Sequence, residues 1–496
     1  MERCESSSVG EEGNYNSSDE PFKPVPFVRI LWIDNSGIHR CRVIPRERLS
    51  FVKKHGLGLS PACLAALSSV SNSPAEGTNL GFTGMIRIIP DLSTRCKIPW
   101  EKQQEMTLAD MCIEPDKPWE YCPREVFRRV TKILKDEFDL VVNVGFEIEF
   151  YLLKSVIKNG KEEWLPIDKT SYCSTSGFDV SSSILEDIVI YLQTMNITVE
   201  QVHAETGKGQ FEVVLGYAEA STAIASLIYA REVIKSVARQ HGQMATFVPK
   251  YAEDEDGSGS HVHISLSRNG ENIFMASGDS KYGMSKIGES FMAGVLNHLP
   301  AIFAFTATHP LRQVIFDNPY CHYYPVSNVL DSIGNTVHIY EHLVPKTRNA
   351  AYLCWGKENT EAPLRTASPP GIADDFVSHF EIKAFDACTN PYIGLASIII
   401  SGVDGLRKDL NLPKPVEGDS DVSGENLRSV PDSISESLIA LGEDTLFSEV
   451  MSENLLTAIK GIRKMEVKNY CEPERDYNFY DQQIYKDPLK DIIFKF

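Results

Sequence analysis

The sequence lacks an apolar run long enough to span a membrane, and it lacks a surplus of basic residues. Its formal net charge of −19 argues against binding of nucleic acid through a basic surface. The eleven cysteines are dispersed singly, with no Cys-x-x-Cys pair, so we expect reduced thiols in a cytoplasmic protein. Residues 1–22 lack the basic and apolar regions of a secretory signal, and their acidic, Ser-rich composition predicts a disordered tail.

The length of 496 residues exceeds one ordinary hydrophobic core, so we expect at least two domains. The first, over 23–115, is predicted to be a small α+β unit. It has two strands joined by a turn over 27–44, a helix that begins at Pro45, and a strand over 85–90. The second, over 118–496, alternates helices and strands.

Periodicity places the elements of the second unit. Predicted helices cover 124–138, 182–195, 219–242, 286–306, 390–405 and a helical tail over 427–470. Predicted strands cover 196–201, 245–249, 261–266 and a segment directly after the first helix.

Carboxylates and imidazoles occur in three short segments of this unit. The pairs are Glu147 and Glu149, Glu205 and Glu212, and His261 and His263. The first and third pairs are two residues apart in predicted strands, so each pair points to one face of a sheet. The second pair flanks a Gly-Lys-Gly turn that a hairpin would close. So many carboxylates on one face repel each other unless cations bind, which predicts a Mg²⁺ or Mn²⁺ site.

Each pair also has a structural interpretation: glutamates on the solvated face of a strand, a polar hairpin, or histidines satisfied in a core. The apolar residues around Glu147 argue against the first, because they indicate a strand covered on both sides. Gly257-Ser258-Gly259 is compatible with phosphate binding, but it lacks the Lys-Ser/Thr of a P-loop.

Four motifs together resemble those of the glutamine synthetase superfamily in order and separation. They are Gly-Phe-Glu-Ile-Glu-Phe at 145–150, the segments 205–212 and 257–261, and Asn-Pro-Tyr at 390–392. The resemblance extends from about Pro26 over almost all of the chain, and it is closest to the plant and fungal nodulin/FluG branch. It implies an α+β fold with an N-terminal β-grasp domain and a catalytic domain with a curved antiparallel sheet flanked by helices. It also implies a homo-oligomer, possibly a dodecamer.

The resemblance implies a ligase that uses ATP and two Mg²⁺ or Mn²⁺ ions per site. Ligands of the ion nearer glutamate would be Glu149, Glu205 and Glu212, and those of the ion nearer the nucleotide would be Glu147, His261 and Glu381. Nucleotide or substrate contacts would come from Gly257, Ser258, Gly259, His263, Arg365 and Lys383. The catalytic positions correspond to His342, Arg365 and Lys383.

Several arginines of the family pattern are replaced. The catalytic Arg corresponds to His342, and the Arg residues two before and two after the last metal ligand correspond to His379 and Lys383. The flap glutamate corresponds to about Arg348, whereas Arg365 is retained. Arg offers a permanently charged fork that His and Lys do not, and each lost donor costs about 3 kcal/mol by analogy with an oxyanion hole.

We therefore expect a ligase that joins glutamate to ammonia or another amine as a γ-glutamyl amide. The lost flap glutamate, and the lack of an aspartate over 76–83, favour an amine larger than ammonia. The alternatives are a catalytically impaired metal-binding scaffold or signalling protein, and an ammonia-specific glutamine synthetase. Residues 311–336 are an atypical insertion, which either gates the site or reflects a retained intron in the gene sequence.

Overall fold

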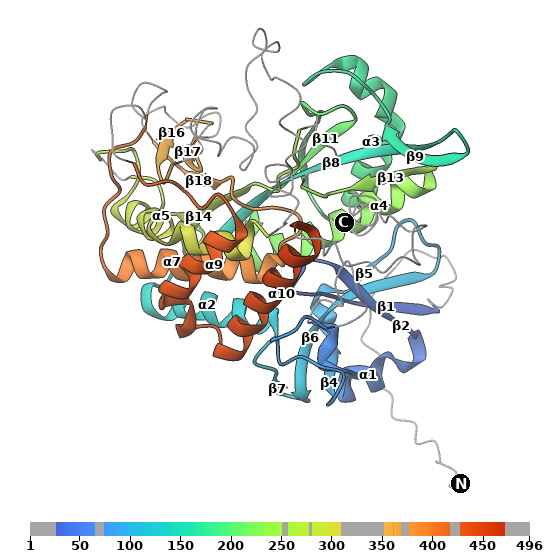
Figure 1. The fold of residues 1–496 in the computed structure, drawn as a ribbon, viewed down its shortest axis with the longest axis horizontal. Coiled ribbons are helices and arrows are strands. Elements are labelled where there is room, and N and C mark those ends of the chain that lie inside the picture. Colours follow the sequence, from blue (N-terminus) through green and yellow to red (C-terminus); the bar gives the residue numbers. More distant parts are fainter. Residues whose placement is uncertain are drawn as a thin grey trace, which may run out of the picture.

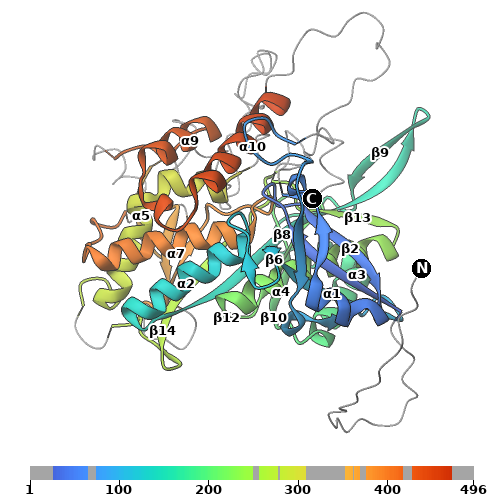
Figure 2. The ribbon, with the colours of Figure 1, turned by 90° about the horizontal axis from the view of Figure 1, so that it is seen from below.

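The computed structural model describes residues 26–64, 74–249, 256–276, 280–308, 352–360, 362–368, 376–416 and 427–471. The predicted tail, the predicted insertion over 311–336, Arg348 and His342 lie outside these ranges. Figures 1 and 2 show two sheets and a layer of helices.

The first sheet comes from the N-terminal part of the chain. Its order is β2-β1-β6-β4-β3, with β5 and β7 paired to β6. The strands are β1 (Phe27–Ile33), β2 (His39–Pro45), β3 (Leu57–Leu59), β4 (Ile86–Pro90), β5 (Cys96–Lys97), β6 (Gln104–Glu114) and β7 (Lys117–Pro118). Helix α1 (Leu49–His55) packs beside β4. The predicted strands, turn and helix of this unit are confirmed, although a 3₁₀ turn precedes the helix.

The second sheet carries the predicted site. Its order is β10-β11-β8-β14-β18-β17-β16, with shorter strands paired to β8 and β14. The strands are β8 (Val141–Lys158), β9 (Lys161–Pro166), β10 (Val199–Ala204), β11 (Gln210–Leu215), β12 (Ala218–Glu219), β13 (Gln243–Thr246), β14 (Val262–Arg268), β15 (Glu271–Asn272), β16 (Trp355–Lys357), β17 (Leu364–Ala367) and β18 (His379–Ile382). Neighbours are antiparallel except β16 and β17, so the predicted antiparallel sheet is in fact mixed.

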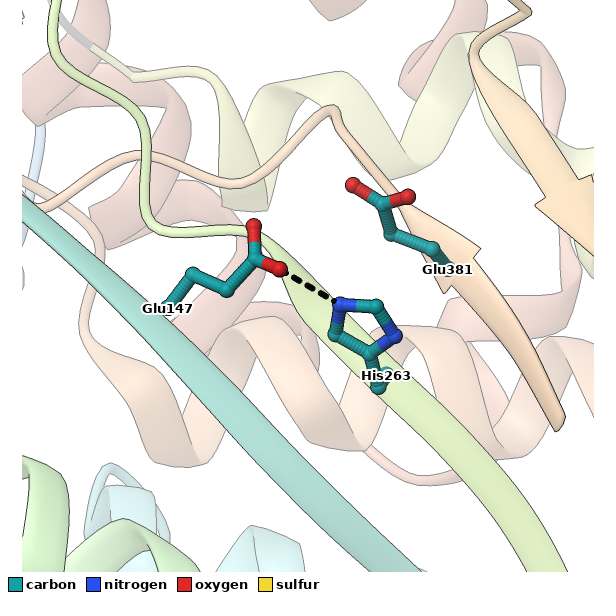
Figure 3. Close-up of side chains that lie close together, drawn as sticks. All are labelled: Glu147, His263 and Glu381. Carbon is teal, nitrogen blue, oxygen red and sulfur yellow. Dashed lines mark hydrogen bonds and ion pairs between the residues drawn. The ribbon is translucent and has the colours of Figure 1, made fainter. Parts of the chain in front are cut away.

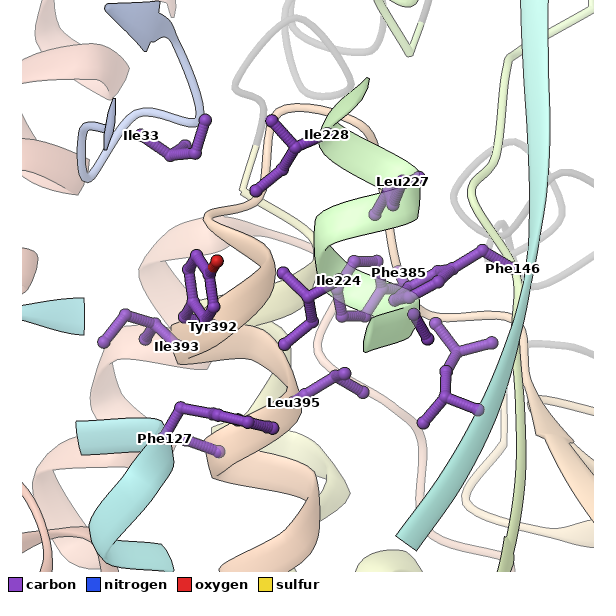
Figure 4. Packing of buried hydrophobic residues seen from close by; sticks show 14 of the residues in the cluster. Ile33, Phe127, Phe146, Ile224, Leu227, Ile228, Phe385, Tyr392, Ile393 and Leu395 are labelled. Carbon is purple, nitrogen blue, oxygen red and sulfur yellow. The ribbon is translucent and has the colours of Figure 1, made fainter. Parts of the chain in front are cut away.

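Strand β8 runs through the whole of this sheet, and Figure 2 shows its far end projecting with β9. Its central residues are buried on both faces, as the apolar residues around Glu147 indicate. Phe146 packs at 6.0 Å, edge to face, against Phe385 in the core shown in Figure 4. Complete burial of one such ring contributes about 1.5–3 kcal/mol.

Besides α1, the described residues form seven α-helices. They are α2 (Pro123–Phe138), α3 (Thr175–Thr194), α4 (Ala220–Gln240), α5 (Lys286–Thr306), α7 (Pro391–Arg407), α9 (Ile434–Glu443) and α10 (Glu453–Cys471). α5 and α7 pack so closely that a Cβ on Gly294 would lie 2.2 Å from the Ser401 carbonyl oxygen. The helix predicted over 286–306 is confirmed to the residue. The predicted helical tail is two helices, because Asp444 leaves the helical conformation at the end of α9.

One of the contacts between the N-terminal unit and the second unit is made at a glycine turn. Gly37 has φ +76°, and a Cβ there would lie 2.2 Å from the Cys388 carbonyl oxygen. Asn390 caps α7 by accepting from the backbone of Tyr392, and its Nδ2 donates to the Ile33 carbonyl. The motif at 390–392 therefore joins the two units.

Eight described cysteines carry free thiols: Cys41, Cys63, Cys96, Cys112, Cys122, Cys173, Cys354 and Cys388. Among those residues, no helix is long and apolar enough to cross a membrane.

A histidine joins three helices of the layer. His298 on α5 places Nδ1 2.6 Å from Asp444 Oδ2 and Nε2 3.0 Å from Asp404 Oδ2, and Lys408 also pairs with Asp404. Burial alone lowers the pKa of His298, but the hydrogen bonds to the two carboxylates outweigh burial and raise it. The stabilisation is thus complete below the ordinary value of 6.5 and is lost as pH rises through the raised value.

We predict that His298→Gln lowers the free energy of unfolding by about 1.5–3 kcal/mol at pH 6, and by less at pH 9. Urea unfolding at both pH values measures this. His241→Gln is the matched control, because His241 pairs only with the more exposed Asp187 and such pairs contribute about 0–1 kcal/mol. A His298→Gln protein with the wild-type pH dependence would contradict the assignment.

Candidate metal and substrate site

The strand register aligns side chains of four strands in one row. Gly145 on β8 lies opposite His263 on β14, and His263 lies opposite Glu381 on β18. Glu381 in turn lies opposite Arg365 on β17. Opposite residues share a face of the sheet, and Glu147, two residues beyond Gly145, shares it too. Residues far apart in the sequence therefore meet on one face.

The first cluster consists of Glu147, His263 and Glu381, which are drawn in Figure 3. Glu147 Oε1 lies 2.9 Å from His263 Nε2, and Glu147 Oε2 lies 2.9 Å from His261 Nδ1. Glu381 is fully buried, and Arg365 donates to its Oε2. Among the residues that the structure describes, none donates a hydrogen bond to its Oε1, although Lys383 Nζ lies 3.9 Å away. This buried acceptor, beside two imidazoles, suits a divalent cation.

His261 lies between the two clusters. Its Nδ1 is 3.3 Å from Glu381 Oε1, and its Nε2 is 3.7 Å from Glu149 Oε1. The sequence predicted His261 as a ligand beside Glu147 and Glu381. In the structure all three residues are within reach of one another, and His263 joins them.

The second cluster consists of His203, Glu205 and Glu212. His203 Nε2 lies 3.1 Å from Glu212 Oε1, and His203 Nδ1 lies 3.5 Å from Glu205 Oε1. Glu149 is directly opposite Glu212 in the sheet. The predicted hairpin therefore brings Glu205 and Glu212 together. His203 was not among the predicted ligands, although its spacing of two from Glu205 is the same signal that singled out His261 and His263.

The two clusters differ in charge balance. Burial raises the pKa of Glu149 to about 8, and nearby Glu212 and Glu205 add to it. Burial and the neighbouring Glu147 raise the pKa of Glu212 well above its ordinary value. Burial opposes ionisation of Glu147 as well, but hydrogen bonds from His261 and His263 hold its pKa well below the usual range. The carboxylates of the second cluster therefore need an added cation more than those of the first.

The glycine loop that carries His261 shapes the site from one side. Gly259 N–H donates to Glu149 Oε2 at 3.0 Å, and a Cβ on Gly259 would lie 2.6 Å from His261 Nε2. Ser258 N–H and Ser260 N–H donate to backbone carbonyls. These amides already donate to groups of the protein itself. The loop therefore holds the Glu149 carboxylate and the His261 imidazole in place.

Two further polar residues support this loop, and no sequence pattern predicted them. Gln210 Nε2 donates to Glu149 Oε2 at 3.1 Å and to the Gly257 carbonyl at 2.7 Å. Arg231, buried in α4, donates to Ser260 Oγ at 3.1 Å. Neither contact follows from sequence spacing, because each joins separate elements.

Two of the replaced arginine positions are described. His379 Nε2 lies 3.1 Å from His263 Nδ1, and burial lowers the pKa of His379 to about 4, so its ring is neutral at pH 7. Lys383 is buried beside Glu381. At position 379, where the family resemblance implies an arginine, the structure has an imidazole.

Comparison with known proteins identifies a family. Residues 120–310 and 328–481 match the glutamine synthetase catalytic domain. The γ-glutamylpolyamine synthetase GlnA3 of Streptomyces coelicolor is 27% identical over 445 residues, which are 88% of this chain and 88% of that protein. Protein fluG of Emericella nidulans is 28% identical over 461 residues, 89% of this chain but 47% of that protein. The crystal structure of a novel glutamine synthase homolog has a TM-score of 0.74 at 25% identity and covers 92% of this chain and 97% of that one.

We predict that Glu212→Gln stabilises the metal-free protein by about 0.5–2 kcal/mol, because it removes one of several crowded negative charges. The same change should remove most of the rise in thermal unfolding midpoint that Mn²⁺ produces in the wild type. Differential scanning calorimetry with and without Mn²⁺ measures both effects. Glu200→Gln, at an exposed position of β10, is the control and should alter neither. Destabilisation of the metal-free protein by Glu212→Gln would contradict the repulsion argument.

Proposed function

This chain belongs to the glutamine synthetase family of ligases, and we propose that it joins an amine to the γ-carboxyl group of glutamate with ATP and Mg²⁺ or Mn²⁺. The observation that carries the proposal is a site built for cations inside the family's catalytic domain. Buried carboxylates crowd one cluster, and in the other no described residue donates a hydrogen bond to Glu381 Oε1.

The residues fit two divalent ions per site. One ion would be held by Glu149, Glu205 and Glu212, with His203 beside them. The other would be held by Glu147 and Glu381 with His261 or His263. Such ions neutralise the phosphates of ATP and orient the transfer.

The protein's own groups would bind and orient the substrates. Arg365 and Lys383 stand beside Glu381 and are the described cations that would face phosphate at this edge of the sheet. Gly257, Ser258 and Gly259 would line the nucleotide side through close backbone approach, since the amides of Ser258 and Gly259 already donate to other groups of the protein. His342 remains a catalytic candidate by its place in the family motif.

The proposed reaction is a phosphoryl transfer followed by an acyl transfer. A γ-carboxylate oxygen of glutamate attacks the γ-phosphorus of ATP, and the bond to the bridging oxygen of ADP breaks. The amine nitrogen then attacks the acyl carbon, loses a proton and displaces inorganic phosphate. Both steps need negative charge neutralised at the carboxylate and the phosphates.

We further propose that the chain is of the nodulin/FluG type and that its amine is larger than ammonia. Its similarity to fluG and to a γ-glutamylpolyamine synthetase supports this, together with the missing aspartate over 76–83. The same proposal includes a cytoplasmic homo-oligomer. It also includes a division into domains at 23–115 and 118–496, and an insertion at 311–336. The family match leaves out residues 311–327, which supports the last of these.

We predict that the purified chain releases inorganic phosphate from ATP only when glutamate, Mg²⁺ or Mn²⁺ and an amine are all present. The amine panel is ammonium, methylamine, putrescine and spermidine, and a larger amine should give the higher kcat/KM. A coupled phosphate assay, with mass spectrometry of the γ-glutamyl amide, measures this.

Glu381→Gln supplies the control for that assay, because the change keeps the size of the side chain but removes the charge beside Arg365 and Lys383. It should abolish phosphate release. If the wild type binds Mn²⁺ but releases no phosphate with any amine, the proposal of a ligase is wrong and the metal-binding scaffold is favoured.

A further inference from the structure

A line of hydrogen-bonding groups leads from β17 to Glu147. The carbonyl oxygen of Ala367 lies 3.4 Å from Ser378 Oγ, which lies 2.8 Å from His379 Nδ1. His379 Nε2 then lies 3.1 Å from His263 Nδ1. The line ends where His263 Nε2 lies 2.9 Å from Glu147 Oε1. Two imidazoles thus stand in series between a hydroxyl group and a carboxylate.

One arrangement of protons satisfies this line without a cation. The Ser378 hydroxyl donates to His379 Nδ1, and His379 Nε2–H donates to His263 Nδ1. His263 Nε2–H then donates to Glu147. Each ring carries one proton, and every group has a partner.

The reversed arrangement also gives every group a partner, except where His263 faces Glu147. The Ser378 hydroxyl donates to the Ala367 carbonyl, His379 Nδ1–H donates to Ser378 Oγ, and His263 Nδ1–H donates to His379 Nε2. Each ring again carries one proton, so no proton enters or leaves the line. The lone pair of His263 Nε2 now faces a carboxylate, and that is favourable only with a cation between them.

The spacing of the facing atoms fits such a cation. Adjacent ligands of an octahedral ion with bonds of about 2.1 Å lie about 3 Å apart. Glu147 Oε1 and His263 Nε2 are 2.9 Å apart. The buried Oε1 of Glu381 lies in the same cluster, with no hydrogen-bond donor in the described part of the chain.

The residue type at 379 decides whether the reversed arrangement exists. A guanidinium has donors only, so an arginine here would oblige His263 Nδ1 to accept. The proton of His263 would then sit on Nε2, where it blocks ligation. A neutral His379 can accept through Nε2, and it leaves His263 Nε2 free.

We propose that His379 is a positioning residue which, by accepting the Nδ1–H of His263, makes His263 Nε2 a ligand of a divalent cation beside Glu147 and Glu381. The inference rests on the proposed function, which supplies the cation. An added imidazole favours Mn²⁺, Co²⁺ or Zn²⁺ over Mg²⁺. The replacement of arginine at this position therefore shifts the ion preference of the first cluster.

The test measures metal binding directly in the full chain. Glu212→Gln serves as the parent, because it removes the second cluster as a binding site and leaves one ion to count. Electron paramagnetic resonance titration with Mn²⁺, with and without competing Mg²⁺, gives both dissociation constants. His379→Gln keeps an acceptor near the position of Nε2, His379→Met has none, and His379→Arg can only donate.

We expect His379→Gln to bind Mn²⁺ nearly as well as the parent, and His379→Met and His379→Arg to bind it about tenfold to 100-fold more weakly. The preference for Mn²⁺ over Mg²⁺ should also fall in the last two. Equal binding by all three variants, or a His379→Gln as weak as His379→Met, overturns the inference and leaves the proposed function intact. If neither the parent nor the wild type binds Mn²⁺, both the inference and the proposed function are wrong. If His379→Met does not fold by circular dichroism, the Gln and Arg variants decide.

Discussion

The site depends on carboxylates that strand β8 holds on a buried face of its sheet. Glu149 is almost fully buried, and the strand that carries it is covered by apolar side chains on both sides. An ionised carboxylate in such a place needs a compensating charge or a set of donors. Gln210 and the amide of Gly259 supply donors to one oxygen only. The compensating positive charge must therefore come from imidazoles or from a cation that binds at the site.

This constraint explains why the crowded buried carboxylates destabilise the site when no cation balances them. In the first cluster, two histidines already balance Glu147. In the second, Glu205 and Glu212 share a single histidine. The free energy stored in that repulsion is recovered when a cation binds, which raises its affinity for the site. The rigid sheet prevents the carboxylates from relaxing apart.

Much of the fold was predictable because the periodicity of its elements is strong. The helix over 286–306 was placed to the residue, since apolar side chains recur along its whole length. Helix α3 was predicted to begin at 182 but begins at Thr175, because its first turns are polar and carry no periodic signal. The parallel pairing of β16 with β17 could not be predicted, because it depends on how distant segments meet.

In the predicted site, too, contacts set by local spacing were predictable, whereas contacts between distant strands were not. The i, i+2 spacing predicted that Glu147 and Glu149 share a face, and the hairpin predicted the approach of Glu205 to Glu212. Glu381 came only from the family resemblance, since it joins β8 through the register of β14 and β18. Gln210, Arg231 and the contact of His379 with His263 were missed for this reason. The sequence alone shows that residue 379 is a histidine, but only the strand register shows that it contacts another imidazole.

The strand register therefore changes the interpretation of the histidine at 379. By sequence it is the loss of a phosphate-binding charge, which favours an impaired enzyme. In the structure the neutral ring is paired on both nitrogens and lies in line with the cluster. A residue that had merely lost its function would not need a buried serine to orient it. The pairing supports the proposal that His379 orients His263 toward a cation, so the residue type at 379 does not by itself favour an impaired enzyme.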